Sequence, residues 1–134
     1  MNLQVEIILR LLLAASLGAA VGYQRGRARK AAGLRTHILI ALGAALFTVA
    51  SIYGFNGTVD PSRVAAGVVA GIGFIGAGVI FRGSRGEEVA GLTSATSIWI
   101  TAAIGLAAGA GMYLISVVAT LITVGILLFP RIRG

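Results

Sequence analysis

The sequence predicts an all-α protein that crosses a membrane five times as a single domain over residues 1–134. Its composition is 57% hydrophobic and only 11% charged, whereas soluble domains average about 45–50% apolar and about 25% charged residues. Five long apolar stretches carry no polar stripe, and basic residues gather between them. These features exclude a soluble enzyme and a disordered chain. The lack of cysteine excludes disulfides, thiolate nucleophiles and cysteine-bound metals.

The five apolar stretches have the length of transmembrane helices. They cover residues 5–23, 36–55, 63–81, 89–108 and 112–129. About 20 apolar residues cross a ~30 Å hydrocarbon core as a helix, whereas strands of a membrane barrel would alternate with a period of two. We expect the first stretch to be a retained helix rather than a secretory signal, because no positive charge precedes it in residues 1–6.

The distribution of Lys and Arg predicts the orientation. If the helices alternate in direction, every basic residue except Arg10 and Arg63 falls on one side. Those residues are Arg25, Arg27, Arg29, Lys30, Arg35, Arg82, Arg85, Arg131 and Arg133. The positive-inside rule therefore places the amino terminus outside and the carboxyl terminus in the cytoplasm. The basic run 25–30 predicts unspecific contact with lipid headgroups and no nucleic-acid binding, because Tyr23 is the sole aromatic beside it.

Charged residues mark the outer ends of the first and third helices. Glu6 and Arg10 are spaced i, i+4 with the acid first, which favours a local ion pair. Asp60 fits the N-cap of the third helix and Pro61 its first position. Arg63 can pair with Asp60 or reach toward Glu6.

Polar residues within the second and fourth helices leave two interpretations open. His37 is either a hydrogen-bonding residue near the membrane interface or a group that responds to protons. Thr93, Ser97 and Thr101 form a hydroxyl stripe on the fourth helix. This stripe is explained by packing hydrogen bonds at least as well as by a path for a solute.

Small residues predict how the helices pack, because in lipid they permit close backbone approach. They occupy most of the circumference of the third helix, which we therefore predict to be the central one. Its glycines are Gly67, Gly71, Gly73, Gly76 and Gly78. Glycine pairs also give close-contact faces to the first and fourth helices, at Gly18 and Gly22 and at Gly105 and Gly109.

The fifth helix is predicted to be peripheral, because it carries a single glycine, Gly125. A narrower inward face is expected from its small and hydroxyl residues at helical spacing. These are Ser116, Ala119, Thr120 and Thr123.

The glycine run of the third helix contains a GxGxxG pattern at Gly71, Gly73 and Gly76. That dinucleotide fingerprint requires a preceding strand and a helix amino terminus, and here it lies in the middle of an apolar helix. Two interpretations remain: tight helix packing, or a locally unwound helix whose freed carbonyls line a polar cavity.

Four stretches carry a resemblance to the membrane domain of the MgtC/SapB family. They are AGLRTH (32–37), GAALF (43–47), DPSRVAAGVVAGIGFIGAGVI (60–80) and GLTSATSIWITAAIGLAAGAGMY (91–113). The resemblance implies a bacterial inner-membrane protein with five helices, linked to growth under magnesium limitation and to virulence. The chain has Gln24-Arg25 where the family commonly has Glu-Arg. Because many members add a cytoplasmic domain, which would follow Arg133, we expect a short member that lacks it.

The sequence favours a non-enzymatic regulatory protein that acts through helix contacts. With one His, no Cys and four carboxylates near helix ends, we expect no catalytic residue, cofactor or bound metal. The predicted partners are the lipid bilayer, a second copy in a dimer, and another membrane protein complex. The alternative is a transporter or channel for magnesium or another ion. The predicted functional core is Arg25, Arg35, Asp60, Arg63, Gly71, Gly73, Gly76, Gly78, Gly91, Thr93 and Trp99.

Overall fold

The computed structural model describes residues 2–30, 32–57, 59–82 and 91–129, and within them every regular element is an α-helix. The helices are α1 (Leu3–Arg27), α2 (Leu34–Tyr53), α3 (Ser62–Arg82), α4 (Leu92–Gly109) and α5 (Tyr113–Leu127). The all-helical prediction is confirmed. Of the basic residues that predict the orientation, Arg85, Arg131 and Arg133 lie outside the described residues.

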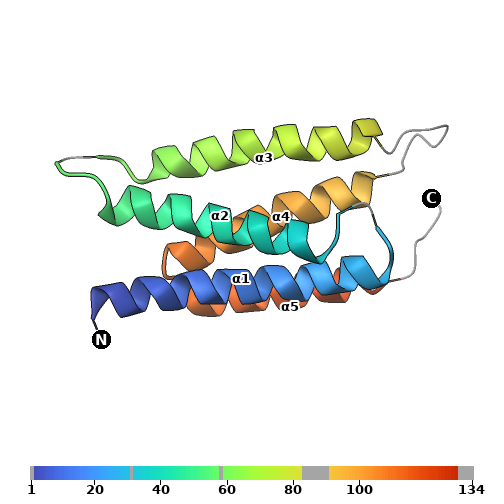
Figure 1. Cartoon of the computed structure of the whole chain (residues 1–134), viewed down its shortest axis with the longest axis horizontal. Helices are drawn as coiled ribbons and strands as arrows, with labels where there is room; N and C mark the ends of the chain where they lie inside the picture. The colour runs from blue at the N-terminus through green and yellow to red at the C-terminus, as the bar shows by residue number, and fades with distance from the viewer. Residues whose placement is uncertain (1, 31, 58, 83–90, 130–134) are drawn as a thin grey trace.

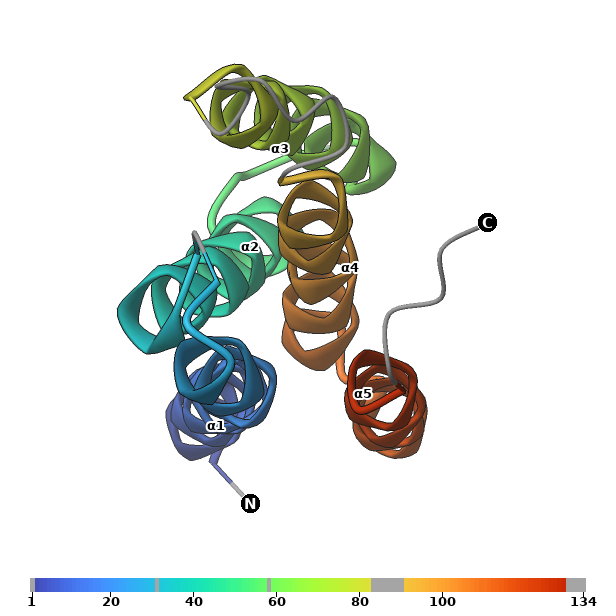
Figure 2. The same cartoon turned by 90° about the vertical axis from the view of Figure 1, so that its right-hand side faces the viewer.

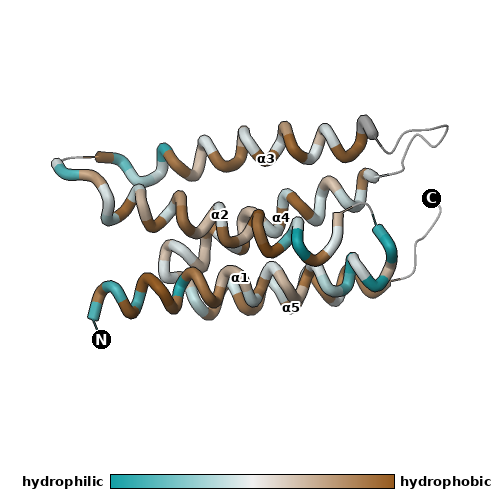
Figure 3. Tube along the Cα trace, viewed as in Figure 1, coloured by the Kyte–Doolittle hydropathy of each residue, from teal (hydrophilic) through white to brown (hydrophobic). Residues whose placement is uncertain are grey.

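Successive helices alternate in direction along one long axis (Figure 1), so α1 begins at one end of the bundle and α5 ends at the other. Four of them, α1 to α4, are long and apolar enough to cross a membrane. Hydrophobic residues follow the helices and polar ones gather toward their ends (Figure 3). Large apolar side chains such as Phe74 and Leu114 are exposed on the outer surface, as expected for a surface that faces lipid. Which end faces the cytoplasm stays a prediction.

The central helix of the bundle is α4. It contacts each of the other four helices and lies between α3 and α5 in the end-on view (Figure 2). In its membrane-spanning window 56% of the residues are buried, compared with 6% for α3. The prediction that the third helix is central is therefore wrong for the single chain.

Glycines on α1 and α4 explain why these two helices, rather than α3, enclose α2. A Cβ added at Gly18 would lie 2.6 Å from the His37 carbonyl oxygen, and one at Gly109 would lie 2.6 Å from that of Ala45. Gly105 meets the backbone of Ala41 in the same way. Since real Cβ atoms essentially never approach so closely, only glycine permits this packing. The predicted close-contact faces of the first and fourth helices are confirmed.

The glycines of α3 mostly face open space. A Cβ at Gly67, Gly71, Gly73 or Gly78 would meet no heavy atom within 4 Å, whereas one at Gly76 would lie 3.6 Å from Ala95 of α4. Small residues cover most of the circumference of α3, so their spacing does not tell which face has a partner. α3 is also a continuous α-helix from Ser62 to Arg82, and the locally unwound alternative is not observed.

The last helix, α5, packs at the side of the bundle against α1 and α4. Its predicted inward face is confirmed, since Ser116, Thr120 and Thr123 are buried and Ala119 is half-buried. Each of the three hydroxyls donates to a carbonyl oxygen three or four residues earlier, at 2.7–2.8 Å. α5 has 15 residues, which makes it about 22 Å long. It is shorter than the predicted span 112–129.

Replacing Gly105 with alanine tests the packing of α4 against α2. We expect Gly105→Ala to lower the free energy of unfolding by about 1–3 kcal/mol, because the added methyl group forces the two backbones apart. Gly71→Ala is the matched control and should gain about 0.5–1 kcal/mol, because alanine favours a helix and this position is open. Circular dichroism during thermal unfolding in neutral detergent measures both. Equal losses in the two variants would contradict the packing described above.

Candidate functional site

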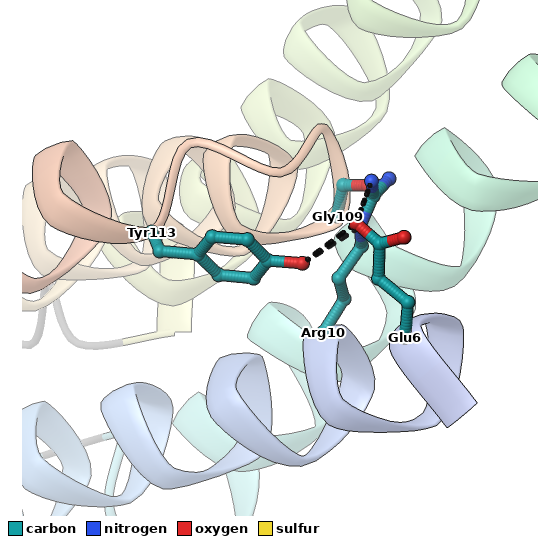
Figure 4. Close-up of polar contacts among 4 residues, drawn as sticks. All are labelled: Glu6, Arg10, Gly109 and Tyr113. Carbon is teal, nitrogen blue, oxygen red and sulfur yellow. Dashed lines mark hydrogen bonds and ion pairs between the residues drawn. The ribbon is translucent and has the colours of Figure 1, made fainter. Parts of the chain in front are cut away.

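Two buried arginines lie at opposite ends of α1, and the first of them forms a fully bonded cluster. Arg10 donates from Nη2 to Glu6 Oε1 at 2.9 Å, from Nη1 to the Gly109 carbonyl at 3.0 Å and from Nε to the Tyr113 hydroxyl at 3.2 Å (Figure 4). Its guanidinium also lies 5.4 Å from the centroid of the Tyr53 ring. The predicted ion pair of Glu6 and Arg10 is confirmed. We call these residues the Arg10 cluster.

The turn between α4 and α5 is shaped to receive Arg10. Gly111 in this turn has φ +87, and a Cβ there would lie 3.0 Å from Arg10 Nη2. Glycine adopts this left-handed conformation without steric cost, so the backbone closes around the guanidinium. The Arg10 cluster thereby ties α1 to the junction of α4 and α5. Because its charge is balanced by Glu6, it acts as a structural clamp.

The second buried arginine, Arg25, lies in the last turn of α1 and is 3% exposed. Its Nη2 donates to the Ser94 hydroxyl of α4 at 2.8 Å. Its Nε is buried and has no hydrogen-bond partner among the described residues. We call Arg25, Ser94, His37 and Ser97 the Arg25 cluster, since all four are buried between α1, α2 and α4.

His37 joins α2 to α4 within the Arg25 cluster. Its Nδ1 lies 2.8 Å from the Gly33 carbonyl and its Nε2 lies 2.9 Å from the Ser97 hydroxyl. A carbonyl oxygen can only accept, so Nδ1 carries the proton in the neutral ring. The single Ser97 hydroxyl proton is then shared between two acceptors within reach, His37 Nε2 and the Ser94 carbonyl. The hydrogen-bonding interpretation of His37 is confirmed, while a response to protons stays a prediction.

The hydroxyl stripe of α4 differs from the predicted one by one residue. Ser97 and Thr101 are buried, but Thr93 is exposed and Ser94 takes its place. The Thr101 hydroxyl donates to the Ser97 carbonyl of its own helix at 2.6 Å. The Ser97 hydroxyl lies 2.8 Å from the Ser94 carbonyl of the same helix. The i, i+3, i+7 spacing of Ser94, Ser97 and Thr101 is the signal that would have identified Ser94.

Three other residues of the predicted functional core lie apart from the Arg25 cluster. Arg35, Thr93 and Trp99 are exposed, and none of them shares a hydrogen bond with Arg25 in the described part of the chain. Arg25 instead contacts Ser94, which the predicted functional core does not include. Gly91, which has φ +88, lies directly before α4 in this region.

Asp60 and Arg63 lie at the opposite end of α3, and both are exposed. Asp60 Oδ1 accepts hydrogen bonds from the Ser62 hydroxyl at 2.7 Å and the Ser62 amide at 3.0 Å. These bonds hold the pKa of Asp60 below its ordinary value and confirm the predicted capping role. Pro61 directly precedes the first residue of the helix. Neither predicted ion pair of Arg63 forms among the described residues.

The remaining residues of the predicted core are Gly71, Gly73, Gly76 and Gly78 of α3, and Gly71 borders a groove. Its volume is about 660 Å³, and it lies between α2 and α3. The lining is apolar and includes Leu39, Gly43, Phe47, Gly67, Gly71 and Ile75. No group of three or more His, Cys, Asp or Glu residues that could hold a metal ion occurs within the described ranges.

Removal of the Arg10 charge tests the clamp at the α4–α5 junction. Arg10→Gln should lower the free energy of unfolding by about 2–3 kcal/mol, because Glu6 and the Gly109 carbonyl lose a charged partner. The exposed Arg63 provides a matched charge control, and Arg63→Gln should stay within about 0.5 kcal/mol of wild type. Thermal unfolding in neutral detergent distinguishes the two. A mild Arg10→Gln variant would show that the cluster contributes little.

Comparison with known proteins extends these observations to a family. The model of the MgtC family matches residues 11–132. "Putative magnesium transporter YhiD" of Escherichia coli (strain K12) is 47% identical over 129 residues, which cover 91% of this chain and 59% of YhiD. "Protein MgtC" of Brucella abortus (strain 2308) is 44% identical over 119 residues, covering 87% of this chain and 49% of that protein.

A third relative shows similar identity, and all three relatives are longer than this chain. "Protein MgtC" of Salmonella typhimurium (strain 14028s / SGSC 2262) is 43% identical over 120 residues, which cover 90% of this chain and 50% of the relative. The chain thus spans between 49% and 59% of the length of these three proteins. No solved structure gives a significant match. The family match and the shared identity together establish that the chain belongs to the MgtC family.

Proposed function

We propose that this chain is a non-enzymatic regulatory protein of the bacterial inner membrane that acts through helix contacts made by α3. The first partner is a second copy of the chain, and the second is another membrane protein complex. Its physiological role is in growth under magnesium limitation and in virulence. The observation that carries the proposal is the open glycine face of α3.

This face has the features of a helix-packing surface. Gly67, Gly71 and Gly78 lie on one side of α3 and have no heavy atom within 4 Å of an added Cβ, and Phe74 beside them is 83% exposed. In lipid no hydrophobic effect drives helices together, so close backbone approach between small residues supplies most of the contact energy. Within the chain, comparable glycines on α1 and α4 are already used against α2. The glycines of α3 offer the same contact to a helix from another molecule.

A second candidate function, ion transport, has two observations in its favour. YhiD carries the name of a magnesium transporter, and α4 has a stripe of buried hydroxyls. However, the hydroxyls of Ser97 and Thr101 are satisfied by carbonyls of their own helix. Divalent cations favour carboxylate and carbonyl ligands, and the described helices place their carboxylate, Glu6, in an ion pair. The regulatory function is therefore preferred.

Replacement of Gly71 with leucine tests the α3 contact. Leucine at this open position leaves the single chain intact but prevents close approach of a second helix, so we expect dimerisation in lipid vesicles to weaken about tenfold or more. Gly125→Leu is the matched control, because Gly125 is also an exposed glycine with no atom within 4 Å. Energy transfer between labelled copies, measured over a series of lipid dilutions, reports the dimer fraction.

The same vesicles discriminate between the two candidate functions. A regulator needs no ion path, so sealed vesicles that contain the protein should pass no more magnesium than empty vesicles. A carrier should show saturable magnesium flux without any partner. Two results together would favour the transporter over the regulator. Magnesium flux would persist in Gly71→Leu, and Gly71→Leu and Gly125→Leu would dimerise equally.

A further inference from the structure

The two buried arginines of the described chain differ in how their charges are balanced. Arg10 has a carboxylate, a carbonyl and a tyrosine hydroxyl as partners. Arg25 is more deeply buried, yet its one hydrogen bond is to the neutral Ser94 hydroxyl, and its Nε has no partner among the described residues. A buried ion costs several kcal/mol unless an opposite charge and hydrogen bonds compensate it. No carboxylate of the described residues therefore balances the charge of Arg25.

Arg25 contacts the amino-terminal turn of α4 through Ser94. Ser94 is the third residue of this 18-residue helix and therefore lies in its first turn, after the N-cap residue Gly91. No side chain forms a capping hydrogen bond there, and the first intrahelical bond is donated by the Ala95 amide to the Gly91 carbonyl. The amides of such a first turn have no partner within the helix and carry partial positive charge. The guanidinium of Arg25 and the amino terminus of α4, both positive, thus meet at Ser94.

Among the described residues, the exposed charges around Arg25 are also positive. The described acidic residues, Glu6 and Asp60, lie at the opposite end of the bundle (Figure 1). At the end that carries Arg25, the exposed basic residues are Arg27, Arg29, Lys30 and Arg35. A cluster of one sign raises the local concentration of oppositely charged ligands.

We propose that Arg25 and the first turn of α4 form a binding site for a phosphate group. Helix amino termini bind phosphate through their free amides, and a guanidinium presents a planar set of donors that matches phosphate geometry. The Ser94 hydroxyl, in the first turn of α4, accepts a hydrogen bond from the Arg25 guanidinium. The group is either the headgroup of an anionic phospholipid or free phosphate, since both carry the same chemistry. Binding of this anion would stabilise the contact of α1 with α4, whether or not α3 forms a dimer.

Thermal unfolding of the purified chain in neutral detergent tests the site. Inorganic phosphate and short-chain phosphatidylglycerol are titrated separately, against sodium chloride of equal ionic strength and phosphatidylcholine of equal chain length. We expect a saturable rise in Tm with at least one phosphate compound and none with either control. A response to phosphatidylglycerol alone identifies a headgroup, and a response to inorganic phosphate identifies the free ion. No saturable response to either compound overturns the proposal.

Two substitutions with matched controls locate the response. Arg25→Gln should weaken phosphate binding about tenfold or more, because a charge-assisted hydrogen bond is lost, whereas Lys30→Gln removes an exposed charge and should change binding less than about threefold. Ser94→Asp places a carboxylate beside Arg25 and should raise Tm while abolishing the phosphate response. Thr93→Asp, on the exposed neighbouring position, should keep the response. Equal behaviour of Ser94→Asp and Thr93→Asp would contradict the site.

Acidic residues of the chain itself provide a further control. Glu87 and Glu88 belong to the segment outside the described residues, and both are replaced in the variant Glu87→Gln/Glu88→Gln. The site predicts unchanged phosphate affinity in this variant. If wild type shows no response and the double variant gains one, a carboxylate of the chain is the partner of Arg25 and the proposal is wrong.

Discussion

The fold depends on the close approach of α2 to α1 and α4. At Gly18 and Gly109 the neighbouring backbone comes within 3 Å of where a Cβ would lie, so no other residue type is compatible with this spacing. Dispersion between well-packed atoms and a few interhelical hydrogen bonds are the main attractive terms available in lipid. Both require such proximity. The hydrogen bond between His37 and Ser97 spans the same interface, because the two backbones already lie close together.

This packing determines what the rest of the chain can do. With α1 held near α4, Arg10 reaches the Gly109 carbonyl at one end and Arg25 reaches Ser94 at the other. The first contact is electrically balanced by Glu6 and the second is not, so one end is a clamp and the other has the character of an anion site. α3 packs on one side of this core, where Ile72 joins a buried cluster with Ile98 and Ala102 of α4. Its remaining surface is free for another molecule.

The sequence predicted the features that depend on local spacing. The five helices follow from apolar length, the pair of Glu6 and Arg10 follows from i, i+4 spacing, and the inward face of α5 follows from its hydroxyls. The position of α3 could not be predicted, because small residues surround it and their pattern does not identify the covered face. Arg25 and Ser94 are 69 residues apart, and neither belongs to a motif that would relate them. Their contact depends on tertiary packing.

Photolabelling of the unmodified chain by a lipid-soluble carbene reagent tests the central position of α4 most directly. The reagent reacts with side chains that face lipid or detergent, and mass spectrometry locates the label. The account predicts strong labelling at Phe74 of α3, which is 83% exposed, and none at Ile98 or Ile104 of α4, which are 0% and 1% exposed. Labelling of Ile98 and Ile104 at the level of Phe74 would contradict it.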